Sequence, residues 1–175
     1  MIFTVVASGE SAQHFERHGT VIGSNDCEKW GKPVDILILV NSPHKFKERI
    51  HTIKKSKAKV LTNSVANWKP YFQNCEKISR LISFNKLILK NFVYSSQTTP
   101  IICLSLAIKM GAKEIIMWGV DFKNHAHFRE GTKSGSREID VYKRFFKECN
   151  RIGVKVYLGA NNTAFDNTLP LWTHI

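Results

Sequence analysis

Short apolar runs recur along the chain, separated by polar turns or by stretches whose apolar residues return at helical spacing. The runs that we expect to be strands are 2–7, 20–23, 35–40, 59–62, 114–118 and 154–158. The runs 35–40 and 114–118 are apolar on both faces, which is typical of strands covered by helices on each side. Strands that alternate with helices in this way predict a three-layer α/β fold with a mainly parallel central sheet.

The segments between these runs predict the helices. We expect helical residues at 13–17, 27–30, 44–55 and 138–152. The stretch 65–96 has a broken pattern. Residues 77–84 fit a strand or a helix, and we favour the strand; residues 85–96 fit either a helix or a loop that closes over a site. Residues 123–136 are polar and rich in Gly, His and Lys, which predicts a long loop of the kind that usually has a function.

The most regular pattern lies in residues 97–122. Thr98 and Thr99 are residue types that commonly cap a helix N-terminus, and Pro100 suits the first helical position. An apolar helix follows, and Gly111 is suited to end it because glycine adopts the left-handed conformation without strain. The next strand leads into a loop at its carboxyl end, where open α/β sheets hold their ligands.

The start of this helix is a candidate phosphate site. Two threonine hydroxyls and the backbone N–H groups lie there at the positive end of the helix dipole, which favours an anion. The alternative is that Thr98 and Thr99 only cap the helix. In the loop after the next strand, which begins at Gly119, we expect the single carboxylate of Asp121 to fix the loop rather than to hold a cation.

Several predicted strands end in small polar residues, namely Ser8, Asn25, Asn41 and Asn63. In a parallel sheet these ends lie along one edge, so their recurrence favours a binding site there. Asn and Ser are also common turn residues, which is the alternative explanation. After the first strand, the small-residue turn 8–11 leads into a helix, an arrangement compatible with phosphate binding.

The net charge of +12 over 175 residues indicates an anionic partner, which is a nucleotide, a nucleic acid or an acidic glycan. Basic residues gather at 45–59 and 143–151, on predicted helices whose apolar residues can face a core. Solvated helix faces explain these groups better than a nucleic-acid surface does. No nucleic-acid-binding motif accompanies them.

The remaining composition predicts a cytoplasmic protein without a resident metal or cofactor. No apolar run has the length of a membrane span, and residues 1–8 lack the basic and apolar regions of a signal peptide. The histidines form no HExxH pattern, and there is no acidic DxD-type motif. No two cysteines form a CxxC pair, so we expect four reduced thiols, at Cys27, Cys75, Cys103 and Cys149.

In their order and residue types, these turns resemble those of the bacterial sialyltransferases that use CMP-sialic acid. They also resemble the wider group of Rossmann-like proteins that includes archaeal hydroxymethylpterin pyrophosphokinases and small phage-encoded glycosyltransferase-like proteins. The most specific correspondence is a Thr-Ser-Gly helix start, a helix ending in Gly, then Lys-Glu-Ile and a Gly-Ile-Asp-Phe loop. The matching residues here are Thr98–Pro100, Gly111, Lys113–Ile115 and Gly119–Phe122.

Two further turns extend the resemblance over nearly the whole chain. The turn 8–11 is similar to a Gly-Asn-Gly-Pro-Ser turn, and Ala160-Asn-Asn162 is similar to a Pro-Asn-Ser turn. The resemblance implies one Rossmann-like nucleotide-binding domain over residues 1–175. The residues that it assigns to nucleotide binding are Ser8, Gly9, Ser11, Asn25, Asn41, Thr98, Thr99, Asn161 and Asn162.

The catalytic residues carry over less directly. The family's general-base histidine falls near Gly135, which cannot serve, whereas His125 and His127 lie earlier in the same predicted loop. A histidine there suits proton abstraction from a sugar hydroxyl near neutral pH. The alternative is that both are solvent-exposed loop residues. The tyrosines that assist the leaving phosphate have no clear match, although Tyr94 and Tyr142 are available.

The sequence therefore predicts a metal-independent glycosyltransferase that transfers a sugar of the sialic acid type from a CMP-linked or other nucleotide-sugar donor to an anionic acceptor. A pyrophosphokinase-like enzyme is one alternative, but its chemistry needs carboxylates for a divalent metal, and the strand ends are rich in Asn and Ser. A non-catalytic protein that binds a nucleotide or nucleic acid is the other, and the charge of +12 favours it.

Overall fold

The structure is a computed structural model that describes residues 1–78, 98–123, 131–161 and 163–173. Its described residues form a seven-stranded sheet with the strand order β5-β4-β3-β2-β1-β6-β7. Every neighbouring pair of strands is parallel. The strands are β1 Ile2–Val6, β2 Thr20–Ser24, β3 Ile36–Leu39, β4 Lys59–Thr62, β5 Cys75–Lys77, β6 Glu114–Trp118 and β7 Lys155–Leu158.

The predicted parallel α/β fold is thus confirmed, and so are six of its strands to within two residues at each end. The strand expected at 77–84 is wrong at its start, because β5 spans Cys75–Lys77, and its residues from 79 onward lie outside the described part. β5 is an edge strand with exposed Glu76 and Lys77, so it lacks the apolar run that identifies the central strands. The segment 85–96 also lies outside the described residues.

Short helices follow the strands of the first half of the chain. They are η1 Glu10–His14, η2 Cys27–Trp30, η3 Pro43–Arg49, α1 Ile50–Ile53 and α2 Val65–Trp68. The predicted helix at 13–17 is wrong, because η1 has already ended when Phe15 turns into the core with extended backbone. The continuous helix expected at 44–55 is also wrong, since Lys47 has a positive φ of 47° that kinks the 3₁₀ segment η3, and the α-helical turn α1 begins only at Ile50.

Two longer helices follow in the second half, α3 Pro100–Lys109 and α4 Lys133–Arg151. α4 begins five residues before the predicted position 138, so the end expected for the preceding loop, at 136, is wrong. The reason is a cap: the Thr132 hydroxyl accepts a hydrogen bond from the Gly135 N–H, which compensates for a glycine in the first turn. No helix among the described residues has both the length and the apolarity that crossing a membrane requires.

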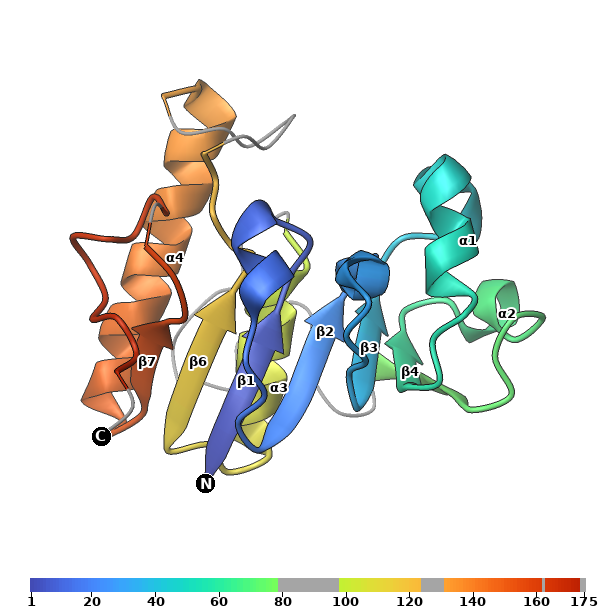
Figure 1. Ribbon diagram of the computed structural model, residues 1–175, viewed down its shortest axis with the longest axis horizontal. Coiled ribbons are helices and arrows are strands. Elements are labelled where there is room, and N and C mark those ends of the chain that lie inside the picture. Colours follow the sequence, from blue (N-terminus) through green and yellow to red (C-terminus); the bar gives the residue numbers. More distant parts are fainter. Residues whose placement is uncertain (79–97, 124–130, 162, 174–175) are drawn as a thin grey trace.

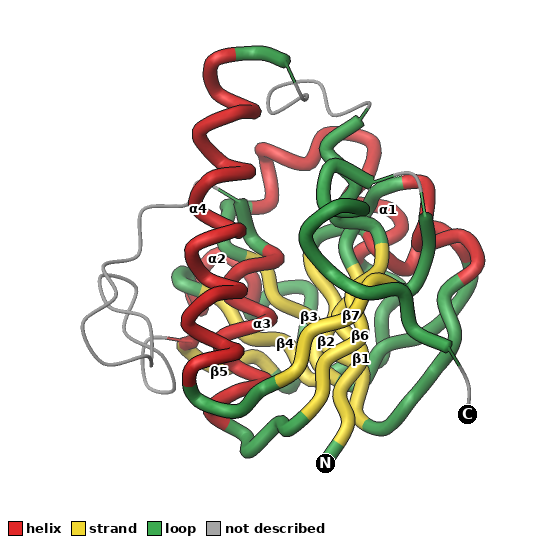
Figure 2. The backbone as a smooth tube through the Cα atoms, turned by 90° about the vertical axis from the view of Figure 1, so that its left-hand side faces the viewer, coloured by secondary structure: helices red, strands yellow, loops and turns green. Residues whose placement is uncertain are grey.

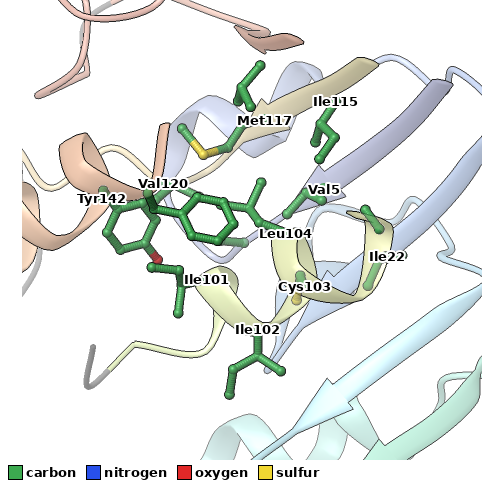
Figure 3. Packing of buried hydrophobic residues seen from close by; sticks show 14 of the residues in the cluster. Val5, Ile22, Ile101, Ile102, Cys103, Leu104, Ile115, Met117, Val120 and Tyr142 are labelled. Carbon is green, nitrogen blue, oxygen red and sulfur yellow. The ribbon is translucent and has the colours of Figure 1, made fainter. Parts of the chain in front are cut away.

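The helices cover the two faces of the sheet differently (Figure 2). α3 and α4 pack on one face, where Ile101 and Leu104 join Val5 of β1 and Tyr142 of α4 in one buried cluster (Figure 3). The other face is covered by the short helices, through residues such as Phe46 and Trp68. Because both faces are covered, the polar groups that remain accessible on the sheet lie at the ends of its strands.

The chain builds the sheet outward from β1 in two directions. β2 to β5 follow on one side, and after α3 the chain returns to place β6 on the other side of β1 (Figure 1). The carboxyl ends of β1 and β6 therefore flank a topological switch point, the position at which open α/β sheets bind ligands. α3 packs against β1 and β2 and begins at this same carboxyl edge, close to Asn25.

Candidate functional site

The carboxyl edge of the sheet gathers most of the residues that the sequence singled out. Ser8 and Gly9 follow β1, Asn25 follows β2, and Asn41 lies two residues after β3. On the other side of β1, Gly119 and Asp121 follow β6, and Asn161 follows β7. These segments are far apart in sequence, but parallel pairing of the strands brings them to one edge.

The loops after β1 and β6 are joined directly. The Gly9 N–H donates to the Gly119 carbonyl at 2.9 Å. Gly119 has a φ of +71°, and a Cβ there would lie 2.5 Å from the Ala7 carbonyl oxygen. A Cβ on Gly9 would lie 2.5 Å from both the Gly119 carbonyl oxygen and the Asp121 carboxylate. Glycine at both positions thus permits two backbones to approach more closely than any side chain would allow.

Ser11 and Asp121 fasten the same junction. The Ser11 N–H donates to Asp121 Oδ2 at 3.0 Å, and the Ser11 hydroxyl donates to Asp121 Oδ1. The Ser11 hydroxyl oxygen also accepts from the Gly119 N–H at 2.7 Å. Asp121 therefore holds the loop after β6 against the turn after β1, and we name these three residues, with Gly9, the β1–β6 latch.

A second network lies between β1 and β2. The Ser8 hydroxyl donates to Asp26 Oδ1 at 2.9 Å, and Arg49 Nη1 pairs with the same oxygen at 3.1 Å. The Asp26 side chain is only 4% exposed, whereas that of Arg49 is 54% exposed. A buried carboxylate needs such partners, because an unpaired charge away from water is costly.

The start of α3 lies over the end of β2. Thr99 Oγ1 is 3.5 Å from Asn25 Oδ1, and the Cys103 thiol contacts the Gly23 carbonyl one turn further along. The Thr98 hydroxyl lies 2.7 Å from the hydroxyl of Tyr142 on α4. Thr99 occupies the N-cap position with helical backbone angles and makes no side-chain cap hydrogen bond. The interpretation that both threonines only cap the helix is therefore wrong for Thr99.

Three polar atoms at the carboxyl ends of strands are buried without a hydrogen-bond partner among the described residues. They are Ser24 Oγ at the end of β2, Asn63 Oδ1 after β4 and Trp118 Nε1 at the end of β6. A Cβ on Gly23 would contact Cys27 on the η2 side, so the alternation along β2 directs Ser24 toward α3. Buried polar atoms are almost always bonded, so unpaired ones at a single edge are consistent with a ligand or water that would bond them.

The remaining predicted residues fall in three places. His125, His127 and Asn162 lie outside the described residues. Asn161 is exposed at the end of β7. The Asn41 side chain is exposed, while its carbonyl accepts from Trp68 Nε1 at 3.0 Å.

Asp26 and Arg49 are the residues of this site that the sequence did not single out. Asp26 directly follows the predicted Asn25, and a carboxylate immediately after a strand-end asparagine was the available signal. Arg49 belongs to a basic group that the sequence explained as a solvated face. Only the tertiary structure shows that one of these cations, at the end of η3, reaches a buried carboxylate that follows β2.

Helical segments with exposed cations lie on both sides of the carboxyl edge. α4 on one side and the η3–α1 segment on the other extend beyond the ends of the strands (Figure 1). Exposed cations there include Lys133 and Arg137 on α4 and Lys45 and Lys47 on η3. Within the described ranges, no group of three His, Cys, Asp or Glu residues could hold a metal ion.

All four cysteines are free thiols, as the sequence predicted. Burial, chiefly, raises the pKa of Cys149 to about 12 and raises the pKa values of Cys27 and Cys103 above their usual range. A raised pKa keeps a thiol protonated and unreactive at neutral pH. These three cysteines are therefore packing residues and not candidate nucleophiles.

Comparison with solved structures identifies the fold. The chain is similar to a sialyltransferase CST-II solved in complex with a trisaccharide acceptor and CMP, with 14% identity and a TM-score of 0.64, covering 100% of this chain and 89% of that one. It is also similar to the sialyltransferase CstII of Campylobacter jejuni solved with the substrate analogue CMP-3FNeuAc, with 17% identity and a TM-score of 0.59, covering 97% of this chain and 84% of that one.

A third similar structure is the monofunctional alpha-2,3-sialyltransferase Cst-I of Campylobacter jejuni, with 14% identity and a TM-score of 0.63, covering 97% of this chain and 79% of that one. No family model and no curated protein matches the sequence. The chain therefore has a sialyltransferase-like fold, as the resemblance predicted, at an identity too low to transfer residue roles.

Proposed function

We propose that this chain is a glycosyltransferase that binds a nucleotide-sugar donor, most simply a CMP-linked sugar of the sialic acid type, at the carboxyl edge of its sheet. The observation that carries the proposal is the meeting of Asn25 and Thr99, 74 positions apart in sequence, at the N-terminus of α3 beside the switch point. A helix N-terminus offers backbone N–H groups and a positive dipole end to a phosphate. The sialyltransferase-like fold supports the same location.

Each part of the edge has a proposed task. The N-terminus of α3, with Thr98 and Thr99, takes the phosphate, and Gly9 holds the first turn in place for the ligand through its close contact with Gly119. Asn25 and Asn41 supply amides, which both donate and accept hydrogen bonds and so suit sugar hydroxyls and a base edge. Asn161 and Asn162 are the proposed contacts to the base.

Catalysis would be an inverting transfer without a metal. The acceptor hydroxyl oxygen attacks the anomeric carbon, the bond from that carbon to the phosphate oxygen breaks, and the acceptor proton passes to a base. His127 or His125 is the proposed base, because imidazole can take a proton near neutral pH. The α3 N-terminus would stabilise the charge that develops on the leaving phosphate. The acceptor is proposed to be anionic, since cations flank the edge.

Thermal unfolding in the presence of CMP, UMP, ADP and GDP tests donor binding. A ligand that binds only the folded chain adds roughly 2.7 kcal/mol of stability at a hundredfold its dissociation constant. We expect CMP to raise the midpoint most and GDP least. Unchanged midpoints with every nucleotide would exclude a nucleotide-dependent transferase.

Release of CMP from CMP-sialic acid in the presence and absence of EDTA tests the chemistry. We expect turnover that is insensitive to EDTA and that falls by at least about a hundredfold in His127→Ala if this residue is the base, a typical contribution of general-base catalysis. His14→Ala replaces an exposed histidine of η1 and serves as the control. Consumption of ATP that requires magnesium, without release of CMP, would instead favour the pyrophosphokinase-like alternative.

A further inference from the structure

The first turn contains two serines, and each donates its hydroxyl proton to a different aspartate. Ser11 bonds Asp121 across the β1–β6 latch, and Ser8 bonds Asp26 across β1 and β2. A carboxylate only accepts hydrogen bonds, so in both pairs the serine must be the donor. The two serines differ in whether the hydroxyl oxygen also accepts a hydrogen bond from the chain.

Both protons of Ser11, on its hydroxyl and its backbone nitrogen, are used in holding the chain together. Its hydroxyl proton is bonded to Asp121, its oxygen accepts from the Gly119 N–H, and its own N–H donates to Asp121. No proton of Ser11 remains for a ligand. The structure therefore assigns to Ser11 a positioning role in place of the direct nucleotide contact that the sequence predicted.

Ser8 keeps an unused acceptor. Its proton is bonded to Asp26, and no donor to its oxygen occurs within the described part of the chain. Arg49 holds Asp26 on the oxygen that receives the Ser8 proton. For Ser8 to donate to a ligand instead, it would have to release a carboxylate that is only 4% exposed, which would leave that charge bonded to Arg49 alone.

Because the Ser8 hydroxyl proton is bonded to Asp26, its oxygen can only accept a hydrogen bond from a ligand. A phosphate oxygen is also an acceptor, so it is excluded as the partner of Ser8. The neighbouring geometry indicates what the partner is. Asn25, which contacts α3 at the proposed phosphate position, and Asp26, which holds Ser8, are consecutive residues. Ser8 is therefore linked to Asp26, the residue that follows Asn25 at the end of β2. A nucleotide with its phosphate at the start of α3 would bring its ribose hydroxyls, the donors nearest to its 5′-phosphate, toward this turn.

We propose that Ser8 is a specificity-determining residue that accepts a hydrogen bond from a ribose hydroxyl of the bound nucleotide, and that Arg49 is a positioning residue that acts on Ser8 through Asp26. This inference rests on the proposed nucleotide site. In this arrangement the turn after β1 contacts the ribose, and the N-terminus of α3 binds the phosphate.

Calorimetric titration with CMP, cytidine, 2′-deoxy-CMP and 3′-deoxy-CMP tests the proposal on the wild-type chain and on Ser8→Ala. In the wild type, loss of the hydroxyl that contacts Ser8 is expected to weaken binding roughly two- to tenfold, the range of a single neutral hydrogen bond. In Ser8→Ala the same deoxy analogue should bind as well as CMP. Removal of the phosphate, from CMP to cytidine, should lower the affinity of the wild type and of Ser8→Ala by the same factor.

Arg49→Gln and Arg17→Gln form a matched pair, because Arg17 also pairs with an aspartate, but at the amino edge. Arg49→Gln should reduce the discrimination between CMP and the deoxy analogue in the wild type and should have no further effect on it in the Ser8→Ala background. A merely electrostatic role of Arg49 would persist in that background and would overturn its assignment. Arg17→Gln should leave the discrimination unchanged.

The outcomes separate this inference from the proposed function. If Ser8→Ala changes the CMP-to-cytidine ratio, or leaves the loss for both deoxy analogues unchanged, the ribose role is wrong while the nucleotide site stands. If the wild type binds none of the four compounds, the proposed function fails and this inference fails with it. Midpoints of unfolding without ligand show whether each variant is folded.

Discussion

The amino and carboxyl edges of the sheet each carry an Arg–Asp pair, and the two pairs use their carboxylates differently. At the amino edge, Asp35 pairs with Arg17 and accepts the Val21 N–H at 2.8 Å, so it joins the strands β2 and β3. Its side chain is 40% exposed. At the carboxyl edge, the nearly buried Asp26 pairs with Arg49 and orients the Ser8 hydroxyl.

The difference extends to other polar groups of the two edges. At the amino edge, the buried Thr4 hydroxyl both donates to the His18 carbonyl and accepts from the His18 N–H. At the carboxyl edge, Ser24 and Trp118 end their strands with buried polar atoms that lack a partner among the described residues. The Thr4 hydroxyl is bonded twice by the chain itself, which stabilises the fold. The carboxyl edge keeps hydrogen-bonding capacity, which is what a binding site requires.

The largest effect is expected at the glycines. Gly119→Ala should destabilise the chain by about 3 kcal/mol, because a positive φ costs roughly 1–2 kcal/mol and the new Cβ would meet the Ala7 carbonyl. Gly153→Ala at the amino edge has a similar φ of +76° with open space around the Cβ, and should cost only about 1 kcal/mol. Urea unfolding measures both. Equal losses would show that the β1–β6 latch is not tightly packed.

Asn25→Asp tests, through the affinity for CMP, whether the carboxyl edge binds a phosphate. Aspartate is similar in size and tolerates the left-handed backbone of Asn25, whose φ is 56°, so stability should change little. Its charge would lie beside the proposed phosphate, and CMP binding should weaken about tenfold or more, as expected for like charges a few ångströms apart. Asn74→Asp places the same charge on an exposed residue before β5 and should leave affinity unchanged. Equal affinities of the two variants for CMP would contradict a phosphate at α3.

Substitution of a buried hydroxyl should have opposite signs at the two edges. Thr4→Val should lower the free energy of unfolding by about 1–2 kcal/mol, because it leaves the His18 backbone groups without their partner. Ser24→Ala should raise it by up to about 1 kcal/mol in the absence of ligand, because it removes an unpaired buried hydroxyl. Chemical denaturation distinguishes the two signs. A loss of stability in Ser24→Ala would mean that the hydroxyl is bonded in the folded chain.

The smallest effect concerns Asp35 and pH. Partial burial raises the pKa of Asp35, but hydrogen bonds from Arg17 and the Val21 N–H, together with the charge of Arg17, outweigh burial and lower the pKa below its usual value. A lowered pKa stabilises the fold above the unfolded value of about 4, and this contribution is lost as the pH falls through the folded value.

Asp35→Asn should therefore cost about 0.5 kcal/mol at pH 7, since the pair is largely exposed, and less as the pH falls from about 5 to 3. Unfolding midpoints of wild type and variant across this range measure the difference. If the stability difference between wild type and Asp35→Asn grew toward low pH, a lowered pKa of Asp35 would be contradicted.

The sequence predicted the central sheet well and its periphery poorly, for one physical reason. β4 and β6 were found at their observed bounds because buried parallel strands are apolar on both faces. The start of β5 was placed wrongly because its exposed residues carry no such signal. The start of α4 was also placed wrongly, because a glycine at position 135 argues against a helix there unless the Thr132 cap is known. The helix expected at 44–55 has a break at Lys47 that no local pattern reveals.

The site shows the same division. Ser8, Asn25 and Asn41 could be selected from sequence because they follow recognisable strands, and parallel pairing then places them on one edge. Which polar groups pair with one another could not be predicted, since Ser11 is 110 positions from Asp121 and Arg49 is 23 positions from Asp26. Whether the oxygen of each serine accepts a hydrogen bond from the chain depends on those partners.

The order of apolar runs and polar turns by itself determined the parallel α/β fold of this protein and the edge on which its polar residues meet, because side-chain burial and strand direction follow from local pattern. Only the tertiary structure decided which polar groups satisfy one another and which remain open to a ligand. Hydrogen bonds are short and directional, so a proton's partner is fixed by the packing of distant segments and not by the residue that carries it.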